Sequence, residues 1–371
     1  MKTKIYLSPP NIDRTEISNV VSAMESGWIS PFGSFTNDFT AVLSEYFKKK
    51  TLLTNSGTSA IHLALRVLGI KEGDYVLCSN FTFAASVFPV LYQKAIPILV
   101  GSEQDTWNLS PDYLEEAVSS LRKKGIAPKA LVLAHIYGMP ACLERIIKIC
   151  EENEILLIED SAETLGSHHD NIPLGSWGRA GVMSFNGNKI VTCSTGGAVI
   201  LPDEETLNHA KKLSVQAKEP VDYYLHNEVG YNFAQSNILA AIGLAQFGKL
   251  KEKTEKRRQI FDRYLSFFEE KTEIWTQKEG EKDFSNRWLS TFCFAEKSLN
   301  VKIKEALEKE NIESRFLWNP MHAQPVFKTV EFFGDKSLDM NLFENGLCLP
   351  SGDNLRNEDL ERIYEVLEKI F

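Results

Sequence analysis

The protein has 371 residues, a length that predicts about two domains. Hydrophobic residues make up 43%, charged residues 25% and aromatic residues 11% of the chain, which excludes a disordered or collagen-like protein. The 50 acidic against 41 basic residues give a formal net charge of −9, which disfavours general binding to nucleic acid or to an anionic membrane.

Targeting and metal-binding patterns are also missing from the sequence. No stretch approaches the ~18 consecutive apolar residues that a membrane helix requires, and the segment 1–10 lacks the apolar core of a signal peptide. The six cysteines form no C-x-x-C pair, which favours free thiols and disfavours a metal site. We expect a cytoplasmic protein that binds no metal, no nucleic acid and no membrane.

The first part of the chain alternates short apolar runs with amphipathic helical patterns. Because alternating strands and helices imply crossover connections, we predict an α/β fold with a mostly parallel sheet flanked by helices. The predicted strands are 51–55, 75–79, 95–100, 130–135, 155–159, 181–185 and 197–201, and the predicted helices are 58–69, 83–93, 112–123 and 143–152.

A charge-rich helical segment at 249–270 follows, which we interpret as a solvated helix between two domains. Helical patterns at 301–310 and 358–370, with strand-like pieces such as 288–294, then predict a smaller α+β domain. We therefore expect a large domain over 1–250 and a small domain over 251–371.

Polar residues directly follow the first predicted strand. Ligands of open α/β sheets bind beyond the carboxyl ends of the strands. Here Ser56-Gly57-Thr58-Ser59 opens a helix, and free amides at a helix N-terminus suit a phosphate. The alternative is an N-cap by Ser56 or Thr58 that needs no ligand. The run is neither a Walker loop nor a G-x-G-x-x-G fingerprint, which disfavours ATP and NAD.

An aromatic residue and a carboxylate follow two further strands. Phe83 lies after the strand 75–79, where it could stack on a planar ligand or pack in the core. Asp160 follows the strand 155–159, where its carboxylate could hold a cationic ring nitrogen or cap a helix.

A single lysine lies in the segment 184–189, among small polar residues and a glycine. A desolvated lysine is nucleophilic and reacts with an aldehyde, so Lys189 is a candidate covalent anchor; the alternative is an ordinary surface lysine. The order phosphate loop, aromatic residue, carboxylate and lysine matches the needs of pyridoxal 5'-phosphate.

With these residues identified, the sequence resembles the DegT/DnrJ/EryC1/StrS family of sugar aminotransferases nearly end to end. The resemblance implies the aspartate aminotransferase-like fold type I of pyridoxal-phosphate-dependent transferases. Its motifs are AsnSerGlyThrSerAla at 55–60, ThrPheAlaAla at 82–85, HisIleTyrGly at 135–138, GluAspSerAlaGlu at 159–163, SerPheAsnGlyAsnLys at 184–189, GlyTyrAsnPhe at 230–233, ArgPheLeuTrpAsnProMetHis at 315–322 and CysLeuProSerGly at 348–352.

The resemblance also assigns roles to residues. It implies that Lys189 and Asp160 are catalytic, the first bound to the cofactor and the second paired with its ring nitrogen. It further implies that Asn232 reaches the phosphate from a partner subunit, so that a homodimer shares its active sites. The implied cofactor-binding residues are Gly57, Thr58, Phe83, Asp160, Glu163, Ser184, Lys189 and Asn232.

Within the family, the sequence most resembles the UDP-4-amino-4,6-dideoxy-N-acetylglucosamine transaminases of bacterial protein glycosylation. Arg315 and His322 suit a diphosphate, because arginine offers a bidentate fork, although Arg315 could instead form a structural ion pair. The implied substrate-binding residues are Gly27, Trp28, Ile29, Ser30, Met183, Arg315, Phe316, Leu317, Trp318 and His322.

The expected reaction transfers an amino group from L-glutamate to C4 of a 4-keto-6-deoxy nucleotide sugar. The alternatives are a C3-keto or a GDP- or dTDP-linked sugar, and a pyridoxal-phosphate-dependent sugar dehydratase, whose members usually carry histidine at the position of Lys189. A non-catalytic cofactor-binding protein and an NAD-dependent oxidoreductase are weaker alternatives. Two positions depart from the family pattern: Glu163 replaces a frequent Gln or His, and Ala234 replaces a frequent arginine.

Overall fold

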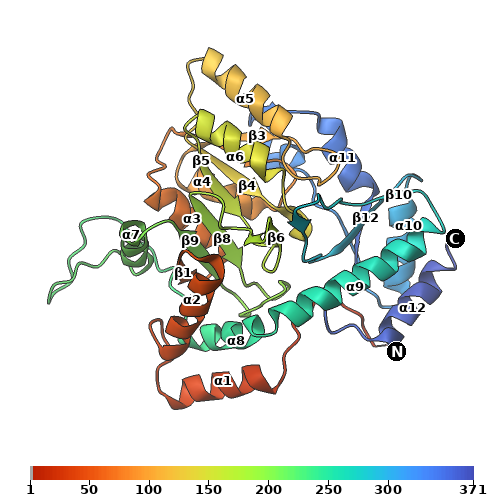
Figure 1. Ribbon diagram of the computed structural model, residues 1–371, viewed down its shortest axis with the longest axis horizontal. Helices are drawn as coiled ribbons and strands as arrows, with labels where there is room; N and C mark the ends of the chain where they lie inside the picture. The colour runs from red at the N-terminus through yellow and green to blue at the C-terminus, as the bar shows by residue number, and fades with distance from the viewer. Residues whose placement is uncertain (1–2) are drawn as a thin grey trace.

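The computed structural model describes residues 3–371, and its centre is an eight-stranded sheet (Figure 1). The strands lie in the order β1-β9-β8-β5-β4-β2-β3-β14. Strand β9 is antiparallel to both neighbours and every pair from β8 to β14 is parallel, which confirms the predicted sheet. The strands are β1 (Lys50–Thr54), β2 (Tyr75–Ser79), β3 (Ile96–Val100), β4 (Ala130–Ala134), β5 (Leu156–Asp160), β8 (Ala180–Ser184), β9 (Gly197–Leu201) and β14 (Phe332–Phe333).

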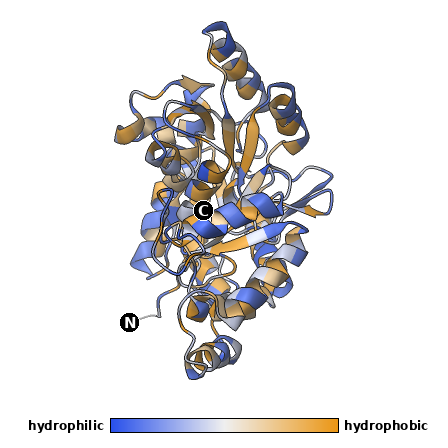
Figure 2. Ribbon diagram, turned by 90° about the vertical axis from the view of Figure 1, so that its left-hand side faces the viewer, coloured by the Kyte–Doolittle hydropathy of each residue, from blue (hydrophilic) through white to orange (hydrophobic). Residues whose placement is uncertain are grey.

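Helices cover both faces of this sheet, because side chains alternate between the two faces along each strand. In β2, Val76 and Cys78 face one core, whereas Leu77 faces the other. Figure 2 shows the hydrophobic colour concentrated on the central strands. The first core lies under α3 (Gly57–Val67), α4 (Phe88–Tyr92) and α7 (Glu204–Ser214), and the second under α5 (Pro111–Lys123) and α6 (Leu143–Glu152).

A second, four-stranded sheet is antiparallel throughout, with the order β10-β12-β15-β13. Three helices pack against it and enclose a separate hydrophobic core. Its strands are β10 (Ile274–Trp275), β12 (Ser290–Phe294), β13 (Arg315–Phe316) and β15 (Gly346–Leu349), and its helices are α9 (Leu250–Glu269), α10 (Leu299–Lys309) and α12 (Asn357–Leu367).

Helix α9 begins at Leu250, next to the predicted domain boundary, and runs from the large sheet toward the small one (Figure 1). Two segments cross this division. Strand β14 pairs with β3 in the large sheet, and Ile5 forms a bridge with Ile312. The two parts of the chain are therefore joined at more than one point.

The remaining helices lie around these two sheets. Helix α1 (Arg14–Glu25) packs on α8 (Asn237–Phe247), which also contacts α2 (Ser34–Phe47), and α11 (Lys336–Asn345) lies beside β15. A small sheet consists of β11 (Asp283–Phe284), β6 (His168–His169) and β7 (Ile172–Pro173). Short 3₁₀ helices are η1 (Ala84–Ser86), η2 (Ile136–Gly138), η3 (Met321–Ala323) and η4 (Pro325–Phe327). Across residues 3–371, no helix is long and apolar enough to span a membrane.

Candidate active site

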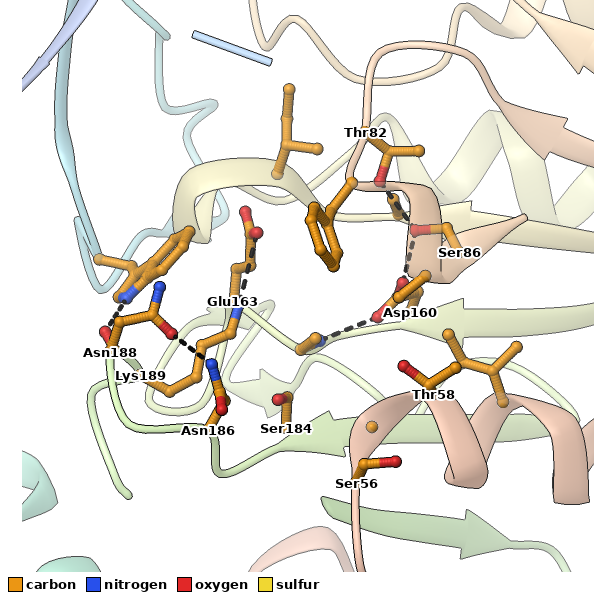
Figure 3. Close-up of a pocket in the computed structure, with 18 of the residues that line it drawn as sticks. Ser56, Thr58, Thr82, Ser86, Asp160, Glu163, Ser184, Asn186, Asn188 and Lys189 are labelled. Carbon is orange, nitrogen blue, oxygen red and sulfur yellow. Dashed lines mark hydrogen bonds and ion pairs between the residues drawn. The ribbon is translucent and has the colours of Figure 1, made fainter. Parts of the chain in front are cut away.

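A cavity of about 360 Å³ lies at the carboxyl ends of β2, β4, β5 and β8 (Figure 3). Its volume falls within the range of roughly 300–1,000 Å³ that is typical of small-molecule sites. Segments far apart in the sequence meet here, because their parallel strands end at the same edge of the sheet. Seven of the predicted cofactor residues line this first cavity: Gly57, Thr58, Phe83, Asp160, Glu163, Ser184 and Lys189.

The floor of the first cavity is the N-terminus of α3. Ser56 caps this helix by accepting a hydrogen bond from the amide of Ser59 (3.0 Å), so the predicted cap is present. Backbone segments approach closely beside it, because a Cβ atom on Gly197 would come within 2.6 Å of the amide nitrogen of Gly57. The cap and an anion site are compatible, since the amides of the first turn have no helical partners.

Asp160 ends β5 on one side of the first cavity. Its carboxylate accepts hydrogen bonds from the hydroxyl of Ser86 (2.6 Å) and from the amide of Ala162 (3.2 Å). Ser86 in turn shares a hydrogen bond with Thr82 (2.8 Å between the hydroxyl oxygens). Burial raises the pKa of Asp160 above its ordinary value. A cation bound in the cavity would therefore relieve an unfavourable buried charge.

Lys189 faces Asp160 across the first cavity (Figure 3). Its side chain is 12% exposed, so it is not an ordinary surface lysine. The amine lies 3.4 Å from a carboxylate oxygen of Glu163 and 4.0 Å from the ring centroid of Trp288. The other carboxylate oxygen of Glu163 accepts from the amide of Tyr137 (2.7 Å), and burial raises the pKa of Glu163. The amine is thus held by a carboxylate and an indole ring.

Aromatic rings form one wall of the first cavity, with Phe83, Trp288 and Trp318 lining it and Tyr137 stacked on the two tryptophans. Phe83 is 54% exposed, and its ring centroid lies 5.4 Å from that of Trp318. Tyr137 stacks on Trp318 (5.9 Å, 7°) and on Trp288 (6.4 Å, 17°). The Tyr137 hydroxyl accepts a hydrogen bond from the amide of Trp318 (2.8 Å), which fixes the stack. An exposed ring at the mouth is available to a planar ligand.

A second cavity of about 340 Å³ adjoins the first, between segment 6–10 and β13. The two cavities share Asn188, Trp288, Arg315 and Trp318, and Phe316 lines the second. Arg315 pairs with Glu313 (2.7 Å), so the predicted ion pair is present, although the arginine side chain remains 60% exposed. The guanidinium therefore lies where the two cavities meet.

Three predicted substrate residues do not reach either cavity. Met183 is 1% exposed in the core, because it precedes Ser184 on β8 and side chains alternate along a strand. Leu317 is likewise buried, at 2% exposure. His322 turns toward Asn80, with 2.9 Å between its Nδ1 and the Asn80 amide nitrogen. These three side chains line neither cavity.

The predicted residues 27–30 and Asn232 also line neither cavity of this subunit. The loop 27–30 is exposed and is anchored by Asn237, whose side-chain amide donates to the carbonyl of Trp28 (2.8 Å). Asn232 is exposed as well, and its carbonyl accepts from the side chain of Asn55 (3.0 Å).

Several residues of the two cavities carry no signal in the sequence for the contacts that they make. Ser86 was not identified as the partner of Asp160, although it stands four residues after Thr82 at the start of a helical segment. Tyr137 lies in the motif 135–138 and Trp288 in the strand-like piece 288–294, yet no pattern in the sequence indicates that they stack. Asn188 was identified only as a neighbour of Lys189.

The residues around the first cavity fit pyridoxal 5'-phosphate. The α3 N-terminus, with Ser184 beside Gly57, offers a narrow cradle for a phosphate that a Cβ atom on Gly57 would crowd, at 3.0 Å from the Ser184 Cβ. Asp160 supplies an anion for a ring nitrogen, and Lys189 supplies an amine for an aldehyde. No group of three His, Cys, Asp or Glu side chains within residues 3–371 is arranged to hold a metal ion.

Comparisons with known proteins agree with this geometry. The DegT/DnrJ/EryC1/StrS aminotransferase family matches residues 10–368. A Bacillus subtilis (strain 168) protein named pyridoxal phosphate-dependent aminotransferase EpsN is 42% identical over 375 residues, covering 100% of this chain and 97% of that protein. The GDP-perosamine synthase of Escherichia coli O157:H7 is 30% identical over 364 residues, covering 98% and 97%.

A solved structure extends the comparison to the fold. The sugar aminotransferase Spr1654 of Streptococcus pneumoniae, in its PLP form, is 27% identical, covers 100% of both chains and superposes with a TM-score of 0.89. The predicted fold class and cofactor are confirmed. The chain therefore belongs to the DegT/DnrJ/EryC1/StrS aminotransferase family and is a pyridoxal-phosphate-dependent aminotransferase.

Proposed function

We propose that the protein transfers the amino group of L-glutamate to C4 of a 4-keto-6-deoxy nucleotide sugar, UDP-4-keto-6-deoxy-N-acetylglucosamine, in the cytoplasm. The observation that carries this proposal is the pair of adjoining cavities. The first holds the Lys189 amine opposite Asp160, and the second provides room for a substrate larger than an amino acid. A nucleotide sugar has a reacting sugar and a distant nucleotide, which suits two connected spaces.

In this proposal Lys189 and Asp160 act on opposite sides of the first cavity. When bound, pyridoxal 5'-phosphate supplies an electron sink for the carbon that loses or gains a proton. Lys189 anchors the cofactor and, when free, accepts and returns that proton through its amine. Asp160 keeps a negative charge beside the ring nitrogen, and Glu163 and Trp288 hold the lysine amine within reach.

Arg315 is proposed to bind the substrate diphosphate. Its fork of N–H donors matches two phosphate oxygens, and it lies at the junction of the two cavities. Its partner Glu313 is held by the amide of Leu7 (3.0 Å), so the arginine has a fixed resting position from which to meet a phosphate. Phe316 and Trp318 add apolar surface for the nucleotide.

We also propose that the enzyme is a homodimer with shared active sites. Ile17, Val21 and Met24 are exposed on one face of α1, and the neighbouring Trp28 and Ile29 are exposed as well. Such an apolar face is typical of a subunit interface. Among the predicted site residues that line neither cavity of this subunit, the exposed residues 27–30 and Asn232 would then serve the site of a second copy.

Product analysis tests the reaction. The enzyme is incubated with UDP-4-keto-6-deoxy-N-acetylglucosamine and ¹⁵N-labelled L-glutamate, and NMR of the product locates the label. We expect ¹⁵N at C4 with the wild type and none with Lys189→Ala. Turnover by Lys189→Ala at near the wild-type rate, or no aminated sugar from the wild type, would contradict the proposal.

A GDP-linked sugar is a second candidate, because a relative of 30% identity is a GDP-perosamine synthase. The same incubation with a GDP-linked 4-keto-6-deoxy sugar discriminates the two. The substrate with the higher kcat/KM is the physiological class, and we expect this to be the UDP-linked sugar.

A further inference from the structure

A buried arginine stands behind the wall of the first cavity. Arg257 lies on α9, and its side chain is 1% exposed. One terminal guanidinium nitrogen donates to the carbonyl of Trp288 (2.6 Å), and both terminal nitrogens lie 3.2 Å from the hydroxyl oxygen of Ser8. The second nitrogen also donates to Asp353 (3.1 Å). A buried charge is costly unless it is paired, and the two terminal nitrogens of this one join three distant parts of the chain.

Asp353 holds the guanidinium in place. Burial alone would raise the pKa of this carboxyl, but the charges of Arg257 and Lys253 lower it below its ordinary value. The Lys253 amine lies 3.0 Å from the second carboxylate oxygen, which also accepts from the side chain of Asn11 (2.9 Å). The anchor of Arg257 is therefore ionised and fixed at both oxygens.

The network converges on the peptide bond that precedes Lys189. The carbonyl of Asn188 accepts two hydrogen bonds, from the hydroxyl of Ser8 (2.9 Å) and from the indole nitrogen of Trp288 (2.9 Å). A serine hydroxyl has a single proton. Because Ser8 accepts from Arg257, that proton is free for Asn188. Both donors to this carbonyl are therefore held by the same guanidinium.

The Trp288 contacts reach the lysine side chain as well. The indole nitrogen holds the backbone before Lys189, while the face of the same ring lies 4.0 Å from the lysine amine. A cation over an indole face is attracted by the ring. One residue, fixed at its carbonyl by Arg257, thus restrains both ends of Lys189.

We propose that Arg257 is a positioning residue for the covalent step. Through Ser8 and Trp288 it fixes the Asn188 carbonyl and so directs the Lys189 amine toward the bound cofactor. The inference rests on the proposed role of Lys189 as the covalent anchor. Arg257 itself does not line the first cavity, so it acts on the site only through Ser8 and Trp288.

The affinities for two forms of the cofactor distinguish positioning of Lys189 from general support of the fold. Condensation of an amine with the aldehyde of pyridoxal 5'-phosphate forms a C=N bond and releases one water. Pyridoxamine 5'-phosphate carries an amine in place of the aldehyde and cannot react with the lysine. Weaker positioning of Lys189 therefore lowers affinity for the aldehyde form alone, whereas a damaged fold lowers both affinities.

The experiment measures the dissociation constants of both forms with cofactor-free protein, by fluorescence titration. We expect Ser8→Ala to weaken binding of the aldehyde form by about fivefold or more, the effect of losing one hydrogen bond, with binding of the amine form unchanged. Trp288→Phe also alters the wall of the first cavity, so we expect it to weaken binding of the aldehyde form more than binding of the amine form. Ser214→Ala is the matched control, because it removes a buried hydroxyl that donates to the carbonyl of Lys211 (2.8 Å) away from the cavity. This control is expected to change neither constant.

Arg257→Lys and its double variant with Ser8→Ala test the shared route. Lysine keeps the charge beside Asp353 but presents its donors from a single nitrogen in place of the two terminal nitrogens of arginine, so the aldehyde form is again expected to bind more weakly. Because both substitutions act through one carbonyl, the double variant is expected to fall short of the product of the single effects. If Arg257→Lys does not fold, Ser8→Ala and Trp288→Phe still decide the question.

The outcomes distinguish this inference from the role of Lys189. Equal weakening of both cofactor forms, or no weakening of either, overturns the positioning role. Borohydride reduction followed by mass spectrometry of the Lys189 peptide tests the anchor separately. A wild-type protein that is not labelled at Lys189 would refute the covalent role, whatever the titrations give.

Discussion

Asp160 and Glu163 are two buried carboxyls within one short segment, and burial raises the pKa of both. For Asp160 the folded protein therefore holds a proton more tightly than the unfolded chain does. The charged form costs stability, and the cost appears as pH rises through the folded-state pKa. A bound cation removes this cost. Asp160 therefore serves the cofactor when it is bound but lowers the stability of the cofactor-free protein.

The change Asp160→Asn tests this trade-off. We expect the cofactor-free variant to be more stable than the wild type at pH 8 by on the order of 1 kcal/mol, with a smaller difference at acidic pH, where the carboxyl is protonated. The rate of amino transfer should fall by at least about a hundredfold, because the ring nitrogen loses its charged partner. Urea unfolding and steady-state rates measure the two effects. A variant that is less stable than the wild type at pH 8 contradicts this account.

Residues at or just beyond the end of a strand could be predicted from the sequence, because a strand end fixes its own position in the site. Gly57, Asp160 and Ser184 are examples. Ser86 and Trp288 could not be predicted, since their contacts depend on how separate segments fold back together. The burial of the Met183 side chain could also have been predicted, because strand alternation places it opposite Ser184.

At the scale of elements, α8 depends on close packing. Gly243 lies where a Cβ atom would come within 2.4 Å of both the Cys193 sulfur and a ring carbon of Phe39. We expect Gly243→Ala to destabilise the protein by about 1–3 kcal/mol, because this overlap outweighs the gain of up to about 1 kcal/mol in helix propensity. Gly248→Ala is the control: its Cβ atom would have its nearest contact at 3.4 Å, so this variant should be neutral or slightly stabilised in urea unfolding.

Helix α11 contributes a titrating contact between the two parts of the chain. Asp339 accepts hydrogen bonds from the Asn80 side chain and from the amide of Ser102 (3.2 Å). Burial raises its pKa from 3.8 to about 6. The folded state therefore favours the protonated carboxyl, and stability is lost as pH rises from about 4 through 6.

Comparison of Asp339→Asn with the wild type measures that loss. The asparagine does not titrate, so the stability of the variant relative to the wild type should rise by roughly 2–3 kcal/mol between pH 4 and pH 7.5. Asp335→Asn is the control on the same helix, because the Ser337 hydrogen bonds lower the pKa of this exposed carboxyl. Urea denaturation at the two pH values gives the result, and a difference that stays constant with pH would refute the assignment.

Strands were more predictable than helices. All seven strands predicted between 51 and 201 are present, with ends that agree within one residue, because short apolar runs bounded by polar residues mark buried strands. The predicted helix 83–93 is broken into η1 and α4, where Pro89 lies in a new first turn. Helix α8 is apolar around most of its surface and so lacks the amphipathic pattern. Strand β14 has two residues and carries no pattern at all.

At the scale of the whole molecule, active sites shared between two subunits predict that two inactive variants can restore activity when they are mixed. Lys189→Ala and Asn232→Ala are each expected to lower activity severely as pure proteins. Subunit exchange between them should restore about a quarter of wild-type activity, since half the dimers are mixed and each mixed dimer has one intact site. Steady-state rates after co-refolding provide the measurement.

A second mixture controls for this result. Lys189→Ala mixed with Asp160→Asn should recover nothing, because both residues line the same cavity of one subunit. Failure of the first mixture to regain activity, despite dimers in sedimentation, would place Asn232 outside the partner's site.

The pairing of β14 with β3 has a consequence for synthesis on the ribosome. The amide of Leu99 donates to the carbonyl of Glu331 (2.9 Å), and that of Gly101 donates to Phe333 (2.8 Å). Until residues 331–333 have been translated, β3 remains an open edge that invites pairing with other chains. A fragment that stops near residue 250 should therefore aggregate, even though it contains every strand of the large sheet except β14. During synthesis, the edge of the large sheet at β3 therefore stays open to pairing with other chains until most of the chain has been translated.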